Sequence, residues 1–122
     1  MNHIIVMVTP RYLPEQSDQA NNTFAFAYHV SIENRGNETV QLMSRHWIIT
    51  DGNSRTKEVK GPGVVGEQPM IDPGQSHHYT SGVTLNTTVG TMEGSYQMIL
   101  DSGEAFDVTI PAFLLSVPGS VH

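Results

Sequence analysis

The sequence predicts an all-β protein built as a two-sheet antiparallel β-sandwich of seven to eight strands. Apolar and polar residues alternate with period two through most of the chain, and turn-forming residues recur about every 8–12 residues. No window has sustained helical spacing, and 11 Gly and 7 Pro with only 15% charged residues are typical of a chain with many turns. A closed barrel is the alternative arrangement of the same strands.

The first two expected strands are Ile4 to Thr9 and Phe24 to Glu33. In the second of these, the aromatic and β-branched residues occupy every other position. An extended chain therefore presents them as one continuous apolar face. Asn34 to Asn37 follows as a turn of residues that tolerate positive φ.

The third expected strand, Thr39 to Thr50, carries apolar residues at both parities, which predicts burial on both faces for part of its length. It contains Trp47, the single tryptophan, at a position typical of the buried tryptophan in immunoglobulin-like sandwiches. The cysteine pair that accompanies it in antibody domains is absent. Asp51 to Asn53 then predicts a hairpin turn.

The second half of the chain begins with a polar strand, Arg55 to Lys60, whose charges are typical of a sheet edge. Gly61 to Gly74 reads as a long loop with four Gly and three Pro, a length that usually marks a functional or partly ordered segment. Further strands are expected at Ser76 to Leu85, Thr91 to Leu100, Phe106 to Ile110 and Phe113 to Val117, with Pro111 breaking the last run.

Composition limits the classes of function. A chain of 122 residues fits one domain, residues 1–122. A net charge of −6 argues against binding nucleic acid through phosphates, and the absence of cysteine excludes thiolate metal sites and disulfides. The longest strongly apolar run, Ile4 to Val8, is too short to span a membrane, and no export signal surrounds it. We expect a cytoplasmic protein that is a monomer or a weak homodimer.

Gly61, Gly63 and Gly66 match the pattern G-x-G-x-x-G of dinucleotide-binding proteins. In those proteins a helix follows the glycines and points its N-terminal amides at a phosphate. Here Glu67-Gln68-Pro69 and then Pro73 prevent such a helix. The favoured interpretation is a tight structural loop, although loop amides can bind an anion without a helix.

The six histidines do not have metal-ligand spacing. His77 and His78 are adjacent and would point to opposite faces of a strand, while His29 and His46 lie on neighbouring runs that could meet without a third ligand. Glu67 and Asp72 could add carboxylates near the long loop. We expect no metal and no cofactor.

No catalytic constellation is evident, since the nucleophile elbow G-x-S-x-G is missing. The segment Ser44-Arg45-His46-Trp47 has the composition of an interface hot spot and equally that of a core strand with one surface cation. Trp47 is better explained as core, and the role of Arg45 stays open. We therefore expect a protein that is not an enzyme.

Blocks of sequence in order along nearly the whole chain resemble the bacterial ApaG family. They are Tyr12 to Ser17, Phe26 to Tyr28, Ser44 to Asp51, Gly61 to Pro69, Tyr79 to Gly82, Gly90 to Tyr96, Ile110 to Phe113, Val117 to Gly119 and His122. The resemblance implies a fibronectin-III-like sandwich, a link to cobalt resistance and magnesium efflux, and frequent encoding beside a diadenosine-tetraphosphate hydrolase. Related domains in eukaryotic F-box and DNA-polymerase-interacting proteins look like protein-interaction modules.

These observations favour a non-enzymatic binding module that acts through an unidentified protein partner. The expected surfaces are the Arg55–Lys60 edge and the long loop, with Arg45, Glu67 and Gln68 as interaction residues. The alternative is a protein that binds or hydrolyses a phosphorylated compound, pyrophosphate or a dinucleoside polyphosphate, at Gly61, Gly63 and Gly66. Direct binding of a divalent cation is a third hypothesis, and an indirect route through a transporter or regulatory partner fits the sequence better.

Overall fold

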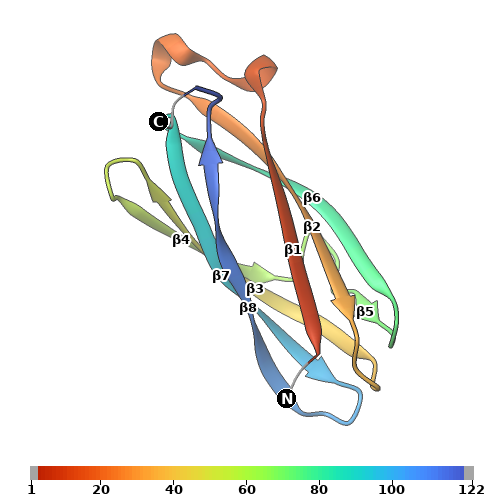
Figure 1. Ribbon diagram of the computed structural model, residues 1–122. Coiled ribbons are helices and arrows are strands. Elements are labelled where there is room, and N and C mark those ends of the chain that lie inside the picture. The colour runs from red at the N-terminus through yellow and green to blue at the C-terminus, as the bar shows by residue number, and fades with distance from the viewer. Residues whose placement is uncertain (1–2, 120–122) are drawn as a thin grey trace.

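A computed structural model describes residues 3–119 of the 122, and these residues form two antiparallel sheets packed face to face (Figure 1). No α-helix occurs among them. Two 3-10 turns, η1 (Pro14–Gln16) and η2 (Gln19–Asn21), lie between the first two strands. The strands are β1 (Ile4–Tyr12), β2 (Phe24–Asn34), β3 (Val40–Asp51), β4 (Thr56–Pro62), β5 (Met70–Ile71), β6 (Ser76–Leu85), β7 (Val89–Leu100) and β8 (Ala105–Ser116).

The predicted sandwich is confirmed. One sheet has the strand order β1-β2-β6, and the other has the order β4-β3-β7-β8, with the short β5 paired to the beginning of β3. The two sheets are separate, so the strands do not close into the barrel that was the alternative.

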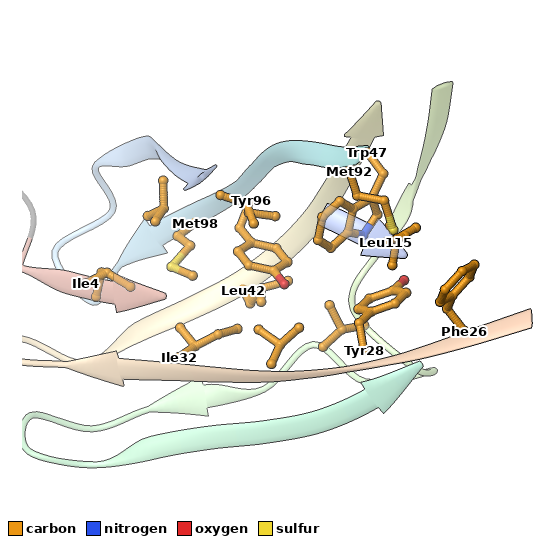
Figure 2. Packing of buried hydrophobic residues seen from close by; sticks show 14 of the residues in the cluster. Ile4, Phe26, Tyr28, Ile32, Leu42, Trp47, Met92, Tyr96, Met98 and Leu115 are labelled. Carbon is orange, nitrogen blue, oxygen red and sulfur yellow. The ribbon is translucent and has the colours of Figure 1, made fainter. Parts of the chain in front are cut away.

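The core lies between the sheets. The apolar stripe of β2 is buried there as the alternation predicts, and side chains of the opposite sheet point toward it (Figure 2). Trp47 is 2% exposed and meets Tyr28 edge-on, with ring centroids 5.4 Å apart. Full burial of each large apolar side chain contributes about 1.5–3 kcal/mol, so this layer supplies most of the driving force for folding.

One feature of β3 differs from the prediction. The strand is not buried on both faces; instead, the pairing with β7 shifts register between Leu42 and Ser44, which makes Met43 a β-bulge. Because the bulge adds one residue, even-numbered residues face the core before it and odd-numbered residues face the core after it. Leu42 before the bulge and Trp47 after it therefore face the same core, while Ile48 lies on the outer side and is only half-buried.

The C-terminal strand also differs, since Pro111 does not break it. β8 is continuous, and its pairing with β7 shifts register between Met92 and Gly94, opposite the segment that holds Pro111. A bulge in an edge strand accommodates a residue without an N–H group. β1, also an edge strand, continues without a register shift through Pro10 to Tyr12, three residues beyond the expected end.

The long loop is more ordered than its composition suggests. β4 continues to Pro62, and β5 occupies Met70 and Ile71. Its remaining residues connect the two strands through the hairpin described below.

The two long sides of the sandwich are unlike each other. On one side β1 and β8, the edge strands of the two sheets, lie in contact (Figure 1). On the other side β4 and β6 are the edge strands, and a groove separates them. No helix within residues 3–119 has the length and hydropathy needed to cross a membrane.

Candidate functional site

The groove between β4 and β6 has a volume of about 660 Å³. Its apolar lining comes from both sheets, and polar residues such as Asn22 and Asn86 also line it. The apolar side chains are those of Leu13, Phe26, Ile49, Val59, Val83 and Leu85. Both walls are strand edges, so backbone polar groups as well as side chains face this space.

The free edge of β4 has a definite pattern of backbone groups. The N–H of Asp51 donates to the carbonyl of Arg55 at 2.9 Å, which places Arg55 among the residues bonded to β3. Because alternate residues of an antiparallel strand bond to the same neighbour, Thr56, Glu58 and Lys60 direct their N–H and C=O groups away from β3. Pro62 ends this row, since it has no N–H to offer.

Positive charge concentrates on β4 and beside it in an acidic protein. Arg45, Arg55, Lys57 and Lys60 are four of the six basic residues of the chain. None of the four forms an ion pair with another residue in the described part of the chain. The neighbouring acids have local partners. Asp51 accepts hydrogen bonds from the backbone N–H groups of Asn53 and Arg55 at 2.8 and 3.0 Å.

Glu58 is the remaining acid on β4, and it points to the outer face of the sheet. Its Oε1 lies 2.7 Å from Nε2 of His46. The groove-facing side of the edge therefore carries the cationic side chains Arg55 and Lys57, and the Asp51 carboxylate lines the same groove.

The glycine motif forms a two-residue β-hairpin. Val64 and Glu67 exchange backbone hydrogen bonds of 2.8 and 3.0 Å, and the two residues between them, Val65 and Gly66, have φ of 47° and 80°. Positive φ at both positions is characteristic of a type I′ turn. No helix follows Gly66, as predicted, so the dipole and amide array of a dinucleotide site are missing.

The other two glycines have packing roles in the structure. Gly61 leaves room for the Arg45 guanidinium, whose Nη1 would lie 3.0 Å from a Cβ at that position. Gly63 has φ of 60° and is too close to the Glu67 carbonyl for any side chain, and its N–H donates to the Met43 carbonyl at 2.9 Å. Of the three glycines named as ligand-binding candidates, Gly66 alone stands at an exposed tip.

A second, smaller cleft of about 340 Å³ lies beside this hairpin. Arg45 lines it together with Tyr28, Val65, Gly66 and residues of β6. Nη1 of Arg45 donates to the carbonyls of Pro62 and Gly63, both at 3.0 Å, which fixes the guanidinium under the hairpin. Arg45 is half-buried, and it faces inward because the Met43 bulge gives it the orientation of Trp47.

Tyr79 lines the Arg45 cleft and contacts the fully buried Tyr96. The Tyr79 hydroxyl from β6 and the Tyr96 hydroxyl from β7 form a short hydrogen bond across the core. Figure 2 shows the Tyr96 side chain within the core. Burial raises the pKa of Tyr79 to about 12 and raises the pKa of Tyr96 further, while the nearby Arg45 charge opposes both shifts. Both hydroxyls are therefore protonated at neutral pH.

The two remaining interaction candidates lie on the outside of the hairpin, and both are exposed. The Gln68 side chain donates to the Met43 carbonyl at 2.9 Å, so its amide holds the loop to the bulge. The Glu67 carboxylate has no hydrogen-bond partner among residues 3–119. The structure thus brings Arg45 together with the hairpin and places Gln68 in a structural contact.

The histidines are dispersed. His78 stacks on His29 on the outer face of the three-stranded sheet, and His77 points to the opposite side, as adjacency predicts. His29 and His46 belong to different sheets, so the hypothesis that they meet is wrong. Asp72 accepts a hydrogen bond from Thr39 at 2.9 Å. Within the described ranges no three His, Cys, Asp or Glu side chains converge on a common point.

Comparison with known proteins decides the family. The family model described as the ApaG domain matches residues 14–100. The chain belongs to the ApaG family. Protein ApaG of Pseudomonas paraeruginosa is 61% identical over 121 residues, which is 99% of this chain and 96% of that protein, and Protein ApaG of Azotobacter vinelandii is 56% identical over 119 residues, or 98% of this chain and 94% of that protein.

A solved structure agrees with the fold of this family member. The crystal structure of a Bordetella pertussis protein named ApaA has a TM-score of 0.94 and 50% identity, covering 97% of this chain and 96% of that chain. The ApaG region, residues 14–100, includes β4, β6 and the hairpin. Both clefts are therefore built mainly from the ApaG region of the chain.

Sequence reasoning missed Tyr28, Tyr79 and Ser81 as lining of the Arg45 cleft. A signal for two of them was present. Tyr79 and Ser81 share parity with Val83 and Leu85 on β6 and therefore face inward. Arg45 is two residues from Trp47 and therefore points to the same face of the strand, so the sequence places a cation on the apolar face.

Proposed function

We propose that this ApaG-family protein is a non-enzymatic binding module, which binds an extended acidic segment of a protein partner as an additional strand beside β4. The free, positively charged edge of β4 along the 660 Å³ groove is the observation that carries the proposal. Strand addition uses backbone hydrogen bonds for affinity and pockets for alternate side chains for specificity.

The edge offers the geometry that strand addition needs. Three residues, Thr56, Glu58 and Lys60, direct backbone donors and acceptors outward, and the apolar groove can receive side chains that point inward from the added strand. Long unprotected edges are usually blocked in soluble proteins. Here Lys57 and Lys60 on β4 and Arg55 just before it outnumber the one acid of the strand, Glu58, which is held by His46 on the outer face. This excess of positive charge would repel a cationic strand and attract an acidic one.

The setting of this binding follows from the sequence and from the resemblance to the family. We place the protein in the cytoplasm, and we propose that its link to cobalt resistance and magnesium efflux is indirect, through a transporter or regulatory partner. The absence of a metal-binding cluster among the described residues supports the indirect route over direct binding of the cation.

The alternative ligand, pyrophosphate or a dinucleoside polyphosphate at Gly61, Gly63 and Gly66, receives less support from the geometry. The Gly63 N–H already donates to the Met43 carbonyl, and the Arg45 guanidinium occupies the space beside Gly61. Titration with pyrophosphate tests this alternative directly. The proposal of a phosphate site predicts saturable shifts of the amide resonances of all three glycines.

Lys60→Pro tests the proposed strand addition. The N–H of Lys60 points away from β3, so proline removes a donor for the partner without removing a bond of the sheet. Lys60→Gln is the matched control, because it removes the same charge and keeps the N–H. Both variants are purified from cells with cross-linked partners and compared with wild type by quantitative mass spectrometry.

We expect at least one protein to be enriched with wild type, retained by Lys60→Gln in reduced amount, and lost with Lys60→Pro. Urea unfolding of the three purified proteins checks that the proline variant is folded. Identical partner lists for all three folded proteins would refute binding at this edge.

A further inference from the structure

We infer that the cleft around Arg45 is a binding site for a carboxylate group. The cleft lies beyond the Pro62 end of β4, separate from the groove where we place the added strand. A carboxylate in this cleft requires no added strand, so the inference goes beyond the proposed function.

The positive charge of Arg45 is not neutralised within the described residues. The guanidinium is half-buried, and no ion pair neutralises it within residues 3–119. Its Nη1 is used by two backbone carbonyls, whereas Nε and Nη2 donate to no described residue. A partly desolvated cation without a counter-ion is unfavourable, and binding an anion relieves that penalty.

Neutral hydrogen-bond donors surround the Arg45 guanidinium in this cleft. The Tyr28 and Ser81 hydroxyls line the cleft, and neither has a hydrogen-bond partner in the described part of the chain. The N–H groups of Val65 and Gly66 at the hairpin tip are also without an acceptor among these residues. A site with one cation and several unused neutral donors matches an oxyanion.

The charge and shape of the Arg45 guanidinium suit a carboxylate better than other oxyanions. One guanidinium balances one negative charge, and the fork of nitrogens on arginine matches the two oxygens of a carboxylate. A pyrophosphate would bring several charges into a protein of net charge −6 with a single cation to meet them. The cleft therefore favours a carboxylate over a polyphosphate.

The strained backbone of Val65 indicates that the hairpin has a role besides packing. Val65 is 62% exposed, and its φ of 47° is a conformation that β-branched residues rarely adopt. Such strain concentrates at sites where it positions groups for function. Here it holds the Val65 and Gly66 amides at the mouth of the Arg45 cleft.

The test is a titration of 15N-labelled protein at constant ionic strength with acetate, with a short peptide that carries one glutamate, and with inorganic phosphate. We expect saturable shifts of the Arg45 Nε–H and of the Val65 and Gly66 amides with both carboxylates. Arg45→Gln should weaken binding at least tenfold. Arg11→Gln removes the same charge from β1, which lines neither cleft, and should stay within twofold of wild type.

Tyr28→Phe removes one hydroxyl and no packing volume, and it should weaken binding severalfold even if Arg45→Gln fails to fold. Tighter binding of the peptide than of acetate would identify the source as a partner segment, and equal binding would identify it as a free small carboxylate. The inference is overturned if no probe gives saturable shifts, if Arg45→Gln and Arg11→Gln weaken binding equally, or if phosphate binds more tightly than both carboxylates.

Discussion

At the scale of single residues, the glycine motif is explained by local geometry. Gly63 and Gly66 both have positive φ, but they differ in surroundings. A Cβ on Gly63 would overlap the Glu67 carbonyl, whereas a Cβ on Gly66 would meet nothing within 4 Å. The glycines are thus required by the backbone, and the chemistry of this region belongs to Arg45.

Gly63→Ala and Gly66→Ala form a matched pair that tests this explanation. Gly66→Ala should lower the free energy of unfolding by about 1–2 kcal/mol, because only the left-handed conformation is penalised. Gly63→Ala should cost more, because the hairpin backbone must also move. Urea denaturation of both variants measures the difference, and equal losses would contradict the packing role assigned to Gly63.

The buried tyrosine pair predicts a pH dependence of stability. The pKa of Tyr79 is raised from 10.0 to about 12 by burial, so the folded protein keeps a proton that the unfolded chain loses. The contribution is complete below pH 10 and is lost as pH rises toward 12, at up to about 1.4 kcal/mol per pH unit for each tyrosine. Unfolding measured from pH 8 to 12 should therefore show a smaller decline for Tyr79→Phe than for wild type. A decline of the same size in both proteins would show that this tyrosine does not contribute.

At the scale of strands, alternation and turn residues were sufficient to predict most elements. The stripe on β2 and the edge position of β4 depend on local pattern, and both are confirmed. The bulges at Met43 and near Pro111 depend on which partner residue lies opposite, and a single strand does not contain that information. The inward orientation of Arg45 could be inferred from the parity that it shares with Trp47, but its position under the hairpin depends on contacts with another strand.

The Arg45 cleft also depends on contacts between strands that the pattern of a single strand does not specify. Its hairpin is local, but the Tyr79 and Tyr96 hydroxyls come from strands in opposite sheets. Their meeting depends on how the sheets pack, which periodicity does not specify. The sequence thus predicted the loop and its lack of a helix, while the cleft beside it became visible only in three dimensions.

Close contact between β3 and β7 gives a prediction at this scale. Gly94 lies opposite Trp47, and a Cβ there would overlap the His46 carbonyl and lie 3.1 Å from the Trp47 Cα. Gly94→Ala should therefore cost more than about 2 kcal/mol, since backbone must shift at the centre of a sheet. Gly82→Ala on β6 is the control, because its nearest neighbour, the Phe26 carbonyl oxygen, is at 3.5 Å. Thermal or urea unfolding compares the two, and a small loss for Gly94→Ala would contradict the account of this contact.

At the scale of the whole molecule, the sandwich has one closed side and one open side. β1 and β8 are in contact, whereas β4 and β6 leave the groove and the Arg45 cleft between them. Most of the basic residues gather along the open side of a protein whose net charge is −6. This asymmetry of shape and charge is the basis for placing binding there.

Photo-crosslinking in living cells tests that placement most directly. A photoreactive amino acid is introduced at Lys60 on the open side or, as the control, at Leu114, which is 50% exposed on β8. The account predicts discrete cross-linked products from position 60 and none of the same products from position 114. Equal products from both positions, or products from position 114 alone, would contradict binding at the open side.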